Sequence, residues 1–453
     1  MSGRIPLAAL VLVLILGGAP ACKPEGEATP AGASAPGTRA PPPVLCPDLR
    51  PPTVTDRRVL QAPNIPEPAA RVPFHDPVFG TCLVRVTDRG ADIASDDSSK
   101  GLKNEYSRVQ AWNADGSLIV LRGTAATWYL YDARTLRRLR LLPMGGPVDP
   151  RWDARDPGLL HYVDGTRLMA CEVRSGRTRL VHDFAVDFPG KKLASVSTRY
   201  EGSPSLDGAT WGLMARDADW KPVALLVYDQ SAGKVTAIRE LQGAPELDTV
   251  TISPRGTTLL AWFDYCRSGR GSLERPCGLM AYSRDLKRAR GLMRIVGHGD
   301  LAFDAGGREV LVYQDTDTDH ISMLDLASGA VTTLWPIDFS HTAQGFHISG
   351  RAFKRPGWAL VSASNGGHPK SWTWMDDQVF AIELRPNGRV ARLAHTHSLV
   401  DEAQEQDYWA EPHATVNPDF TRIVFTTNWG RTGTDQVETF MVALPPGWID
   451  RLP

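Results

Sequence analysis

The chain has 453 residues, and its 50 lysines and arginines nearly balance its 51 aspartates and glutamates, which leaves a formal net charge of −1. A charge this small argues against nucleic acid and against an acidic membrane surface as principal partners. Hydrophobic residues make up 42% of the chain, as in an ordinary soluble globular protein, and the 41 glycines and 13 tryptophans suit many short strands joined by tight turns.

Residues 1–21 have the pattern of a secretory signal peptide. Arg4 precedes an apolar stretch from Leu7 to Leu16, which is too short to span a bilayer comfortably. Small residues then lead directly into Cys22, as in a bacterial lipoprotein signal. We therefore predict lipidation of Cys22 and a place in the bacterial cell envelope, anchored by lipid on the periplasmic side or at the outer surface. The alternative is plain secretion with cleavage near Ala21.

A segment rich in proline and alanine, residues 22–55, follows the predicted signal peptide. Pro41-Pro42-Pro43 and Pro51-Pro52 favour an extended, semi-rigid chain. A segment of this composition cannot bury enough apolar surface to fold. We predict a disordered tether that holds a folded domain, residues 56–453, away from the membrane.

Five further cysteines follow the tether or lie within it, and export would permit disulfides between them. Cys266 and Cys277 flank a polar segment typical of a long hairpin loop, and we predict that they form a disulfide. Cys46 could reach Cys82 and tie the tether to the first strand. Cys171 lies in an apolar run and is predicted to be a buried free thiol. The chain has no C-x-x-C pair, which argues against a structural zinc site of the cysteine type.

The region after the tether lacks helical periodicity and consists of short apolar runs bounded by glycine, aspartate or proline. One pattern, an apolar run, a tight turn and a second apolar run, recurs at roughly the 40–50 residue period of a β-propeller blade. The turns of this pattern are Asp115-Gly116, Asp164-Gly165, Asp207-Gly208, Pro254-Arg255-Gly256, Ala305-Gly306-Gly307 and Asn417-Pro418-Asp419.

The predicted fold class is all-β, a single β-propeller of seven four-stranded blades, with six or eight blades as alternatives. The blades are expected at residues 104–142, 147–183, 197–240, 246–290, 295–336, 343–394 and 406–446. The run from Thr81 to Thr87 is left over at the front, and we expect it to complete the last blade and close the ring. A pair of β-sandwiches would need a linker that the sequence lacks, and β-helix repeats are far shorter.

Three histidines, His298, His347 and His413, lie in equivalent places, each before a strand that leads to a turn. Equivalent positions on successive blades face one another around the channel of a propeller, so these imidazoles should converge. Converging imidazoles commonly bind a transition metal, and the carboxylate of Glu411 would complete the set. We predict a divalent metal site, for manganese, zinc or calcium. The alternative is that the histidines only satisfy backbone groups at the channel mouth.

The chain resembles oligogalacturonate lyase, a family of seven-bladed propellers, in outline over most of residues 75–446. The segments that carry the resemblance are Asp76–Thr87, Asn104–Leu136, Glu411-Pro412-His413, Asn417-Pro418-Asp419, Ile423–Trp429 and Val442–Pro445. In that family, histidines and a glutamine hold manganese, and another histidine is the base. The resemblance implies that His347 and His413 are metal ligands and that His298 is the catalytic base.

The sequence departs from the family pattern at three places. Glu411 replaces a ligand histidine, and Tyr408 falls near the place of the ligand glutamine. No counterpart of the family's catalytic arginine is recognisable. The implied reaction is a β-elimination, in which a base removes the proton beside a uronate carboxylate and a cation offsets the developing charge. Tyr408 and Trp409 are candidates for substrate contact, because aromatic rings can stack on sugars.

Asp315, Asp317 and Asp319 alternate as the acidic residues of calcium loops do, but the downstream glycine and glutamate of an EF-hand are missing. An exposed loop between strands is the favoured interpretation. The chain has no recognisable Ser-His-Asp arrangement, Gly-x-Ser-x-Gly, P-loop or dinucleotide fingerprint.

Two functions follow from the sequence. The first is a monomeric, lipid-anchored propeller that binds a glycan or a protein partner at the channel mouth and has a channel metal site. The alternative is a metal-dependent lyase that cleaves uronate polysaccharides by β-elimination.

Overall fold

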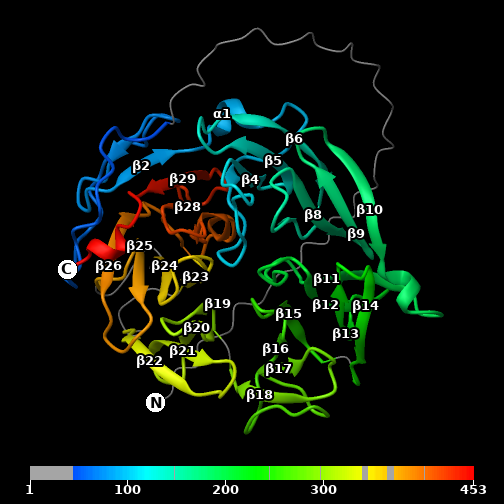
Figure 1. The fold of residues 1–453 in the computed structure, drawn as a ribbon. Coiled ribbons are helices and arrows are strands. Elements are labelled where there is room, and N and C mark those ends of the chain that lie inside the picture. Colours follow the sequence, from blue (N-terminus) through cyan, green and yellow to red (C-terminus); the bar gives the residue numbers. More distant parts are fainter. Residues whose placement is uncertain are drawn as a thin grey trace, which may run out of the picture. The chain divides into compact units, whose positions relative to one another are not determined.

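The computed structural model describes residues 44–453 apart from 147, 244, 296, 339–344, 365–371 and 402, and these residues belong to one compact unit, Pro42–Pro453. Their strands form seven antiparallel sheets that follow one another around a centre (Figure 1). The prediction of an all-β propeller with seven blades is therefore confirmed. The predicted signal peptide, the greater part of the tether and Cys22 lie outside the described residues.

Each of the first six blades has four strands in chain order. The strands of blade 1 are β3 (Leu102–Lys103), β4 (Leu118–Gly123), β5 (Thr127–Asp132) and β6 (Arg138–Gly145). Those of blade 2 are β7 (Arg151–Trp152), β8 (Leu159–Asp164), β9 (Arg167–Glu172) and β10 (Arg177–Asp183). Those of blade 3 are β11 (Leu193–Ser197), β12 (Thr210–Asp217), β13 (Pro222–Asp229) and β14 (Lys234–Glu240).

The next three blades repeat this plan. The strands of blade 4 are β15 (Leu247–Ile252), β16 (Thr258–Phe263), β17 (Leu279–Ser283) and β18 (Ala289–Met293). Those of blade 5 are β19 (Gly299–Phe303), β20 (Glu309–Asp315), β21 (His320–Asp325) and β22 (Val331–Pro336). Those of blade 6 are β23 (Gly345–Ser349), β24 (Trp358–Ser364), β25 (Gln378–Glu383) and β26 (Val390–His395).

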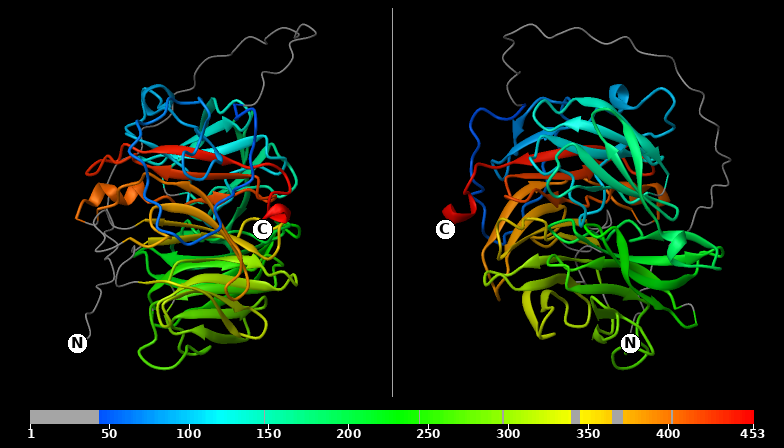
Figure 2. Two further views of the ribbon diagram at one scale, coloured as in Figure 1. Left: turned by 90° about the vertical axis from the view of Figure 1, so that its left-hand side faces the viewer. Right: turned by 45° about the vertical axis from the view of Figure 1, so that its right-hand side comes forward.

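Blade 7 combines strands from both ends of the unit. It contains β27 (Thr415–Val416), β28 (Arg422–Thr427), β29 (Glu438–Ala443), β2 (Cys82–Arg85) and β1 (Phe74–His75). β2 pairs antiparallel with β29, from Cys82 opposite Ala443 to Arg85 opposite Phe440. Figure 2 shows the early strands, in blue, beside the last strands, in red. The expectation that Thr81–Thr87 completes the last blade is thus confirmed.

Among the described residues, helical structure is confined to short segments. These are α1 (Arg89–Asp92) and the 3₁₀ helices η1 (Phe184–Asp187), η2 (Glu405–Ala410) and η3 (Ile449–Arg451). Within the described ranges, no helix has the length and apolar character needed to cross a membrane.

Burial along the strands explains the hydrophobic patterns of the sequence. Every residue from Ala224 to Tyr228 in β13 is buried, because the two central strands of a blade are covered by neighbouring blades on both faces. The outermost strand β14 instead alternates exposed and partly buried residues. The core consequently lies between blades, as where Phe346 of blade 6 packs with Val312 of blade 5.

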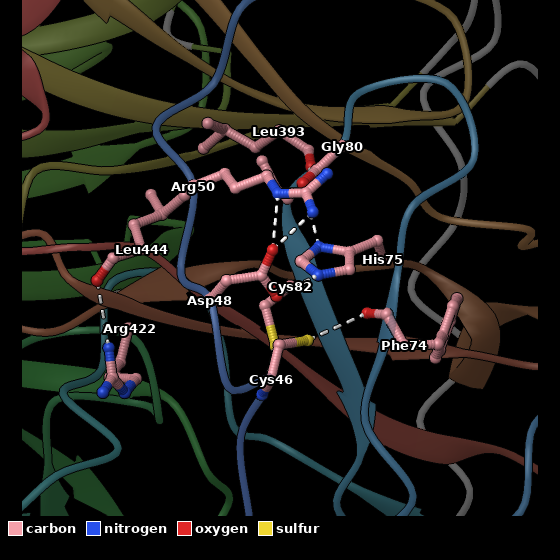
Figure 3. Close-up of a disulfide and its surroundings, with 11 residues drawn as sticks. Cys46, Asp48, Arg50, Phe74, His75, Gly80, Cys82, Leu393, Arg422 and Leu444 are labelled. Atoms are coloured by element: carbon pink, nitrogen blue, oxygen red, sulfur yellow. Dashed lines mark hydrogen bonds and ion pairs between the residues drawn. A yellow bond between two sulfur atoms is a disulfide. The ribbon is translucent and has the colours of Figure 1, made fainter.

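The N-terminal segment is attached to the propeller from residue 44 onward. Cys46 forms a disulfide with Cys82 of β2 (Figure 3), and the amide of Val44 donates to the Arg134 carbonyl at 2.9 Å. The Val54 carbonyl accepts a hydrogen bond from the amide of Arg392. Residues 44–55, which the sequence assigned to the disordered tether, are therefore held in place. A covalent link and backbone hydrogen bonds provide the order that their apolar content could not.

Candidate metal centre

The three histidines singled out in the sequence come from three consecutive blades and lie together. His298 immediately precedes β19, and His413 lies two residues before β27. His347 is the third residue of β23, opposite Ser362, so it lies inside its strand rather than before it. The ring centroids of His298 and His347 are 4.7 Å apart, and those of His347 and His413 are 4.1 Å apart.

Glu411 connects two of these imidazoles. Its Oε2 lies 3.1 Å from Nε2 of His347 and 3.0 Å from Nε2 of His413. One ligand atom from each of the three residues falls within 4.8 Å of the others, while both histidines are buried. His413 has a left-handed φ of 42°, and Asn104 Nδ2 donates to its carbonyl at 2.7 Å. The backbone thus adopts an uncommon conformation where it places the ligand.

The donor set fits a divalent transition metal. Two imidazole nitrogens and one carboxylate oxygen are ligands that zinc, manganese and iron share, and three protein ligands leave positions open for substrate or water. The other ring nitrogen of His347, Nδ1, is buried and has no hydrogen-bond partner among the described residues. The geometry therefore satisfies the first condition for a metal centre, which is convergence of the ligand atoms.

The electrostatics of the cluster favour an ionised carboxylate at Glu411 and a neutral imidazole at His413. Burial raises the pKa of Glu411, but the hydrogen bonds from His347 and His413 outweigh burial, and the net pKa lies well below the usual value. Burial, followed by the charges of His347 and Lys103, lowers the pKa of His413 well below its usual value. Neutral imidazole and ionised carboxylate are the forms that bind metal.

Tyr106 joins the fourth predicted residue, His298, to this cluster. The hydroxyl of Tyr106 lies 2.7 Å from Nδ1 of His298, and its ring centroid is 4.6 Å from that of His413. Burial, followed by the proximity of His347, lowers the pKa of His298 to about 3, so its imidazole is neutral at neutral pH. Sequence reasoning missed Tyr106, because the irregular stretch after β3 gives no sign that it enters the channel.

Lys103 is a second residue that the sequence did not reveal. Its Nζ lies 3.4 Å from Nδ1 of His413 and 5.4 Å from the ring centroid of Trp409. Burial, with a smaller contribution from Arg122, lowers the pKa of Lys103 to about 8. The ring of Trp409 also faces the Arg122 guanidinium at 5.5 Å, so this predicted substrate contact is engaged by two cations.

Tyr408 remains accessible beside the cluster. Its side chain is about half exposed, and its ring centroid lies 6.4 Å from that of His413. The structure therefore brings Tyr408 to the same site as the predicted ligands, with a ring face that a substrate could reach.

An ion pair between a buried arginine and a partly buried glutamate lies beside Tyr106. Nη1 of Arg108 is 3.1 Å from Oε2 of Glu201, and the Arg108 guanidinium lies 5.4 Å from the Tyr106 ring centroid. Burial raises the pKa of Glu201 to about 7, while Arg108 opposes this rise. Neither residue belongs to a recognisable motif, and only the fold brings them to the channel.

The cysteines take the following places. Cys266 is bonded to Cys277, at the two ends of the loop between β16 and β17. Cys46 is bonded to Cys82, and Cys171 is buried with a free thiol.

The aspartate-rich loop of blade 5 does not form a calcium cage. Oδ2 of Asp315 accepts hydrogen bonds from the hydroxyls of Tyr313, Thr318 and Ser322 at 2.8–3.2 Å. Asp317 pairs with Arg294 at 3.2 Å. Because these carboxylates already have protein partners, the loop interpretation is the one that the contacts favour.

Comparison of the sequence with protein-family models and with curated proteins gives no match. Comparison of the fold gives solved structures with clear similarity. One is an oligogalacturonate lyase in complex with manganese, at 15% identity and a TM-score of 0.59, with 88% of this chain and 100% of that chain covered. Another is an oligogalacturonate lyase from Vibrio parahaemolyticus, at 11% identity and a TM-score of 0.58, with 87% and 99% covered. At these identities the likeness establishes the fold alone. The chain is therefore a seven-bladed β-propeller similar in fold to oligogalacturonate lyase.

Proposed function

We propose that this protein is a metal-dependent lyase that cleaves uronate-containing oligosaccharides by β-elimination. The observation that carries the proposal is the convergence of His347, Glu411 and His413 next to His298. An elimination next to a carboxylate requires a base and a cation that offsets the developing charge. The uncharged imidazole could serve as the base, and the ligands beside it could hold the cation. The fold that the chain shares with manganese-containing oligogalacturonate lyase supports the same choice.

His298 is the proposed base. Its neutral imidazole can accept the proton from the carbon beside the uronate carboxylate, and a carboxylate bound nearby would raise its pKa toward the range of an effective base. Tyr106 holds the ring through the hydrogen bond at Nδ1, and with Nδ1–H donating to the tyrosine oxygen, Nε2 is the atom that would accept the proton. A divalent cation held by His347, Glu411 and His413 supplies Lewis acidity that offsets the charge developing on the carboxylate.

The ligand set also narrows the choice of metal ion. Calcium takes oxygen ligands almost exclusively, whereas two of the three donors here are imidazole nitrogens. Manganese and zinc both accept imidazole with carboxylate. We therefore propose manganese or zinc in preference to calcium.

The test begins with the exported chain carrying Cys22→Ser, purified with and without His347→Ala/His413→Ala. Elemental analysis should find close to one metal ion per chain in the parent and little in the double variant. The parent should convert oligogalacturonate into a product that absorbs as an unsaturated uronate. His298→Ala should retain the metal and lose the product.

His320→Ala is the matched control, because His320 lies on the same blade as His298 and its ring contacts the carbonyl of Thr318 rather than a residue of the metal centre. It should keep both metal and activity. A metal-free parent that stays metal-free after incubation with manganese or zinc would overturn the proposal. So would full activity in the His298→Ala protein.

A second candidate is a propeller that binds a glycan or protein partner without turnover. Glu411 and Tyr408 occupy the places where the resemblance to the lyase family expects a histidine and a glutamine, which favours this reading. A parent protein that holds metal and binds uronate oligosaccharides but yields no unsaturated product would identify it.

We also propose export and lipid anchoring at Cys22. The leader sequence supports this, and so do the two disulfides, because disulfides persist in oxidising compartments outside the cytosol. Expression with labelled palmitate should label the parent chain and leave the Cys22→Ser chain unlabelled. An unlabelled parent of the same mature mass as the variant would show plain secretion instead.

A further inference from the structure

A cleft lined by arginines and aromatic rings lies between blades 2 and 3, and none of the metal ligands lines it. Its enclosed volume is about 80 Å³. The polar, charged and aromatic residues of blade 3 that line this cleft are Ser195, Ser197, Arg199, Tyr200, Arg216 and Trp220. They come from β11, from the bend that follows it, and from the β12–β13 hairpin.

The cleft opens at the same end of the propeller as the metal centre. Trp220 lies in the turn between the second and third strands of its blade, and His298 lies in the connection that enters a first strand. In an antiparallel blade of four strands these two kinds of connection fall at one end. A continuous set of contacts also links the two places. Tyr200 adjoins Glu201, which pairs with Arg108, and Arg108 lies over the ring of Tyr106 beside His298.

The guanidinium of Arg216, which lines this cleft, has a hydrogen-bond donor without an acceptor among the described residues. Its Nη2 donates to the carbonyl of Leu247 over 3.4 Å, while its Nε is buried and has no partner in the part of the chain that the structure describes. A buried donor without an acceptor is uncommon in proteins. Burial, followed by the proximity of Arg199, lowers the pKa of Arg216. An anion that entered the cleft would satisfy this guanidinium.

The acidic groups around the cleft are already engaged. Asp248 accepts from Nη1 of Arg199 at 2.8 Å. Asp164, which also lines the cleft, pairs with Arg167 at 3.0 Å. Neither carboxylate is hydrogen-bonded to Arg216 among the described residues, although the charges of Asp248 and Glu246 act on its guanidinium. Nε of Arg216 therefore remains without an acceptor there.

Three residues of the cleft have strained backbone. Arg199, Tyr200 and Trp220 have φ values of 59°, 73° and 63°, in the left-handed region that large side chains rarely adopt. Strain of this kind clusters at ligand sites, where the surrounding structure imposes it. Tyr200 and Trp220, which both line the cleft, are 37% and 50% exposed. Exposed aromatic rings are platforms on which sugar rings stack.

We infer that this cleft is a second sugar subsite, which binds one carboxylate-bearing residue of an acidic oligosaccharide that extends to the metal centre. The cleft is large enough for a carboxylate and the adjoining ring atoms, and Trp220 supplies the stacking face outside it. This inference rests on the proposed function, because it concerns the substrate of the proposed lyase. It implies that this substrate is an extended chain with several charged residues.

The test is calorimetric titration of the exported chain carrying Cys22→Ser with trigalacturonate, in the presence of EDTA. Its uncharged methyl ester is the comparison. Trigalacturonate should bind, and the ester should bind at least tenfold more weakly. Arg216→Gln and Trp220→Gly should each weaken trigalacturonate binding at least tenfold. Glycine is chosen at residue 220 because it tolerates positive φ without strain, so the ring is removed and the turn is kept.

Arg177→Gln is the matched control, since Arg177 is a surface arginine of blade 2 that pairs with Glu172, and its binding should equal that of the parent. Equal dissociation constants in the parent, Arg216→Gln and Trp220→Gly would overturn the subsite, as would absence of binding by the parent. Different results would contradict the proposed lyase function and the proposed subsite. Arg216-dependent binding without unsaturated product would contradict only the lyase. Product formation with an unchanged KM in both cleft variants would contradict only the subsite.

Discussion

The hydroxyl of Tyr106 lies 2.7 Å from Nδ1 of His298, although 192 positions separate the two residues in the sequence. The contact spans the ring from blade 1 to blade 5, and the two other histidines lie against the same tyrosine ring. Tyr106 is therefore the residue that fixes the proposed base relative to the proposed metal ligands.

Removal of that hydroxyl should slow catalysis without removing the metal. In Tyr106→Phe the ring of His298 loses the hydrogen bond at Nδ1, and misplacement of a catalytic group by about 1 Å can cost up to about 100-fold in rate. We expect kcat on oligogalacturonate to fall by about that factor while metal content stays at the parent level. Tyr265→Phe, at an exposed tyrosine, is the control. Loss of metal from Tyr106→Phe would show instead that the tyrosine supports the ligands.

Metal binding should stabilise the fold. A ligand that binds only the folded state adds about 2.7 kcal/mol to the free energy of unfolding when its concentration is 100 times its Kd. We expect manganese or zinc at that ratio to raise the free energy of unfolding by about this amount, as measured by denaturant titration. Glu411→Gln should need a higher metal concentration for the same gain, and His347→Ala/His413→Ala should show no gain. An equal gain in the double variant would place the ion elsewhere.

A buried ion pair between blades 5 and 6 should be important for stability. Asp300 Oδ2 accepts from Arg351 Nε at 2.9 Å and from the amide of Gly350 at 2.8 Å, and both side chains are buried. Asp300→Ala would leave the guanidinium buried without its partner, which typically costs about 3–5 kcal/mol of unfolding free energy. Asp317→Ala, which breaks the exposed pair with Arg294, should cost less than about 1 kcal/mol. Similar losses in the two variants would contradict this assignment.

Glu201 should make stability depend on pH. Burial raises the pKa of Glu201 from 4.5 to about 7 in the folded protein, so the folded state binds this proton more tightly than the unfolded state does. Its contribution to stability is greatest below pH 4.5 and falls as the pH rises toward 7, above which it is constant. Glu201→Gln should remove this decline from the free energy of unfolding measured across that interval. Glu172→Gln, at an exposed ion pair, should retain it. An unchanged slope in Glu201→Gln would assign the titration to another group.

The sequence by itself determined the architecture. The recurring tight turns, such as Asp115-Gly116, and the apolar runs between them predicted a propeller and favoured seven blades over six or eight, because turn chemistry and strand periodicity are local properties of the chain. The leftover run around Cys82 also identified the strand that closes the ring, since an incomplete last blade must take its missing strand from elsewhere. The equivalent placement of His298 and His413 predicted their convergence, because a repeated fold carries equivalent positions to one place.

Only the tertiary structure decided what surrounds those histidines. Lys103 comes from the two-residue strand β3, and Tyr106 and the Arg108–Glu201 pair come from the irregular stretches after β3 and β11, where no period or motif marks the direction of a side chain. The order of residues 44–55 likewise depends on a disulfide to β2 and on hydrogen bonds to distant blades, which composition does not encode. Local patterns follow from neighbours in the chain, whereas burial, pKa and contact across the channel follow from closure of the ring.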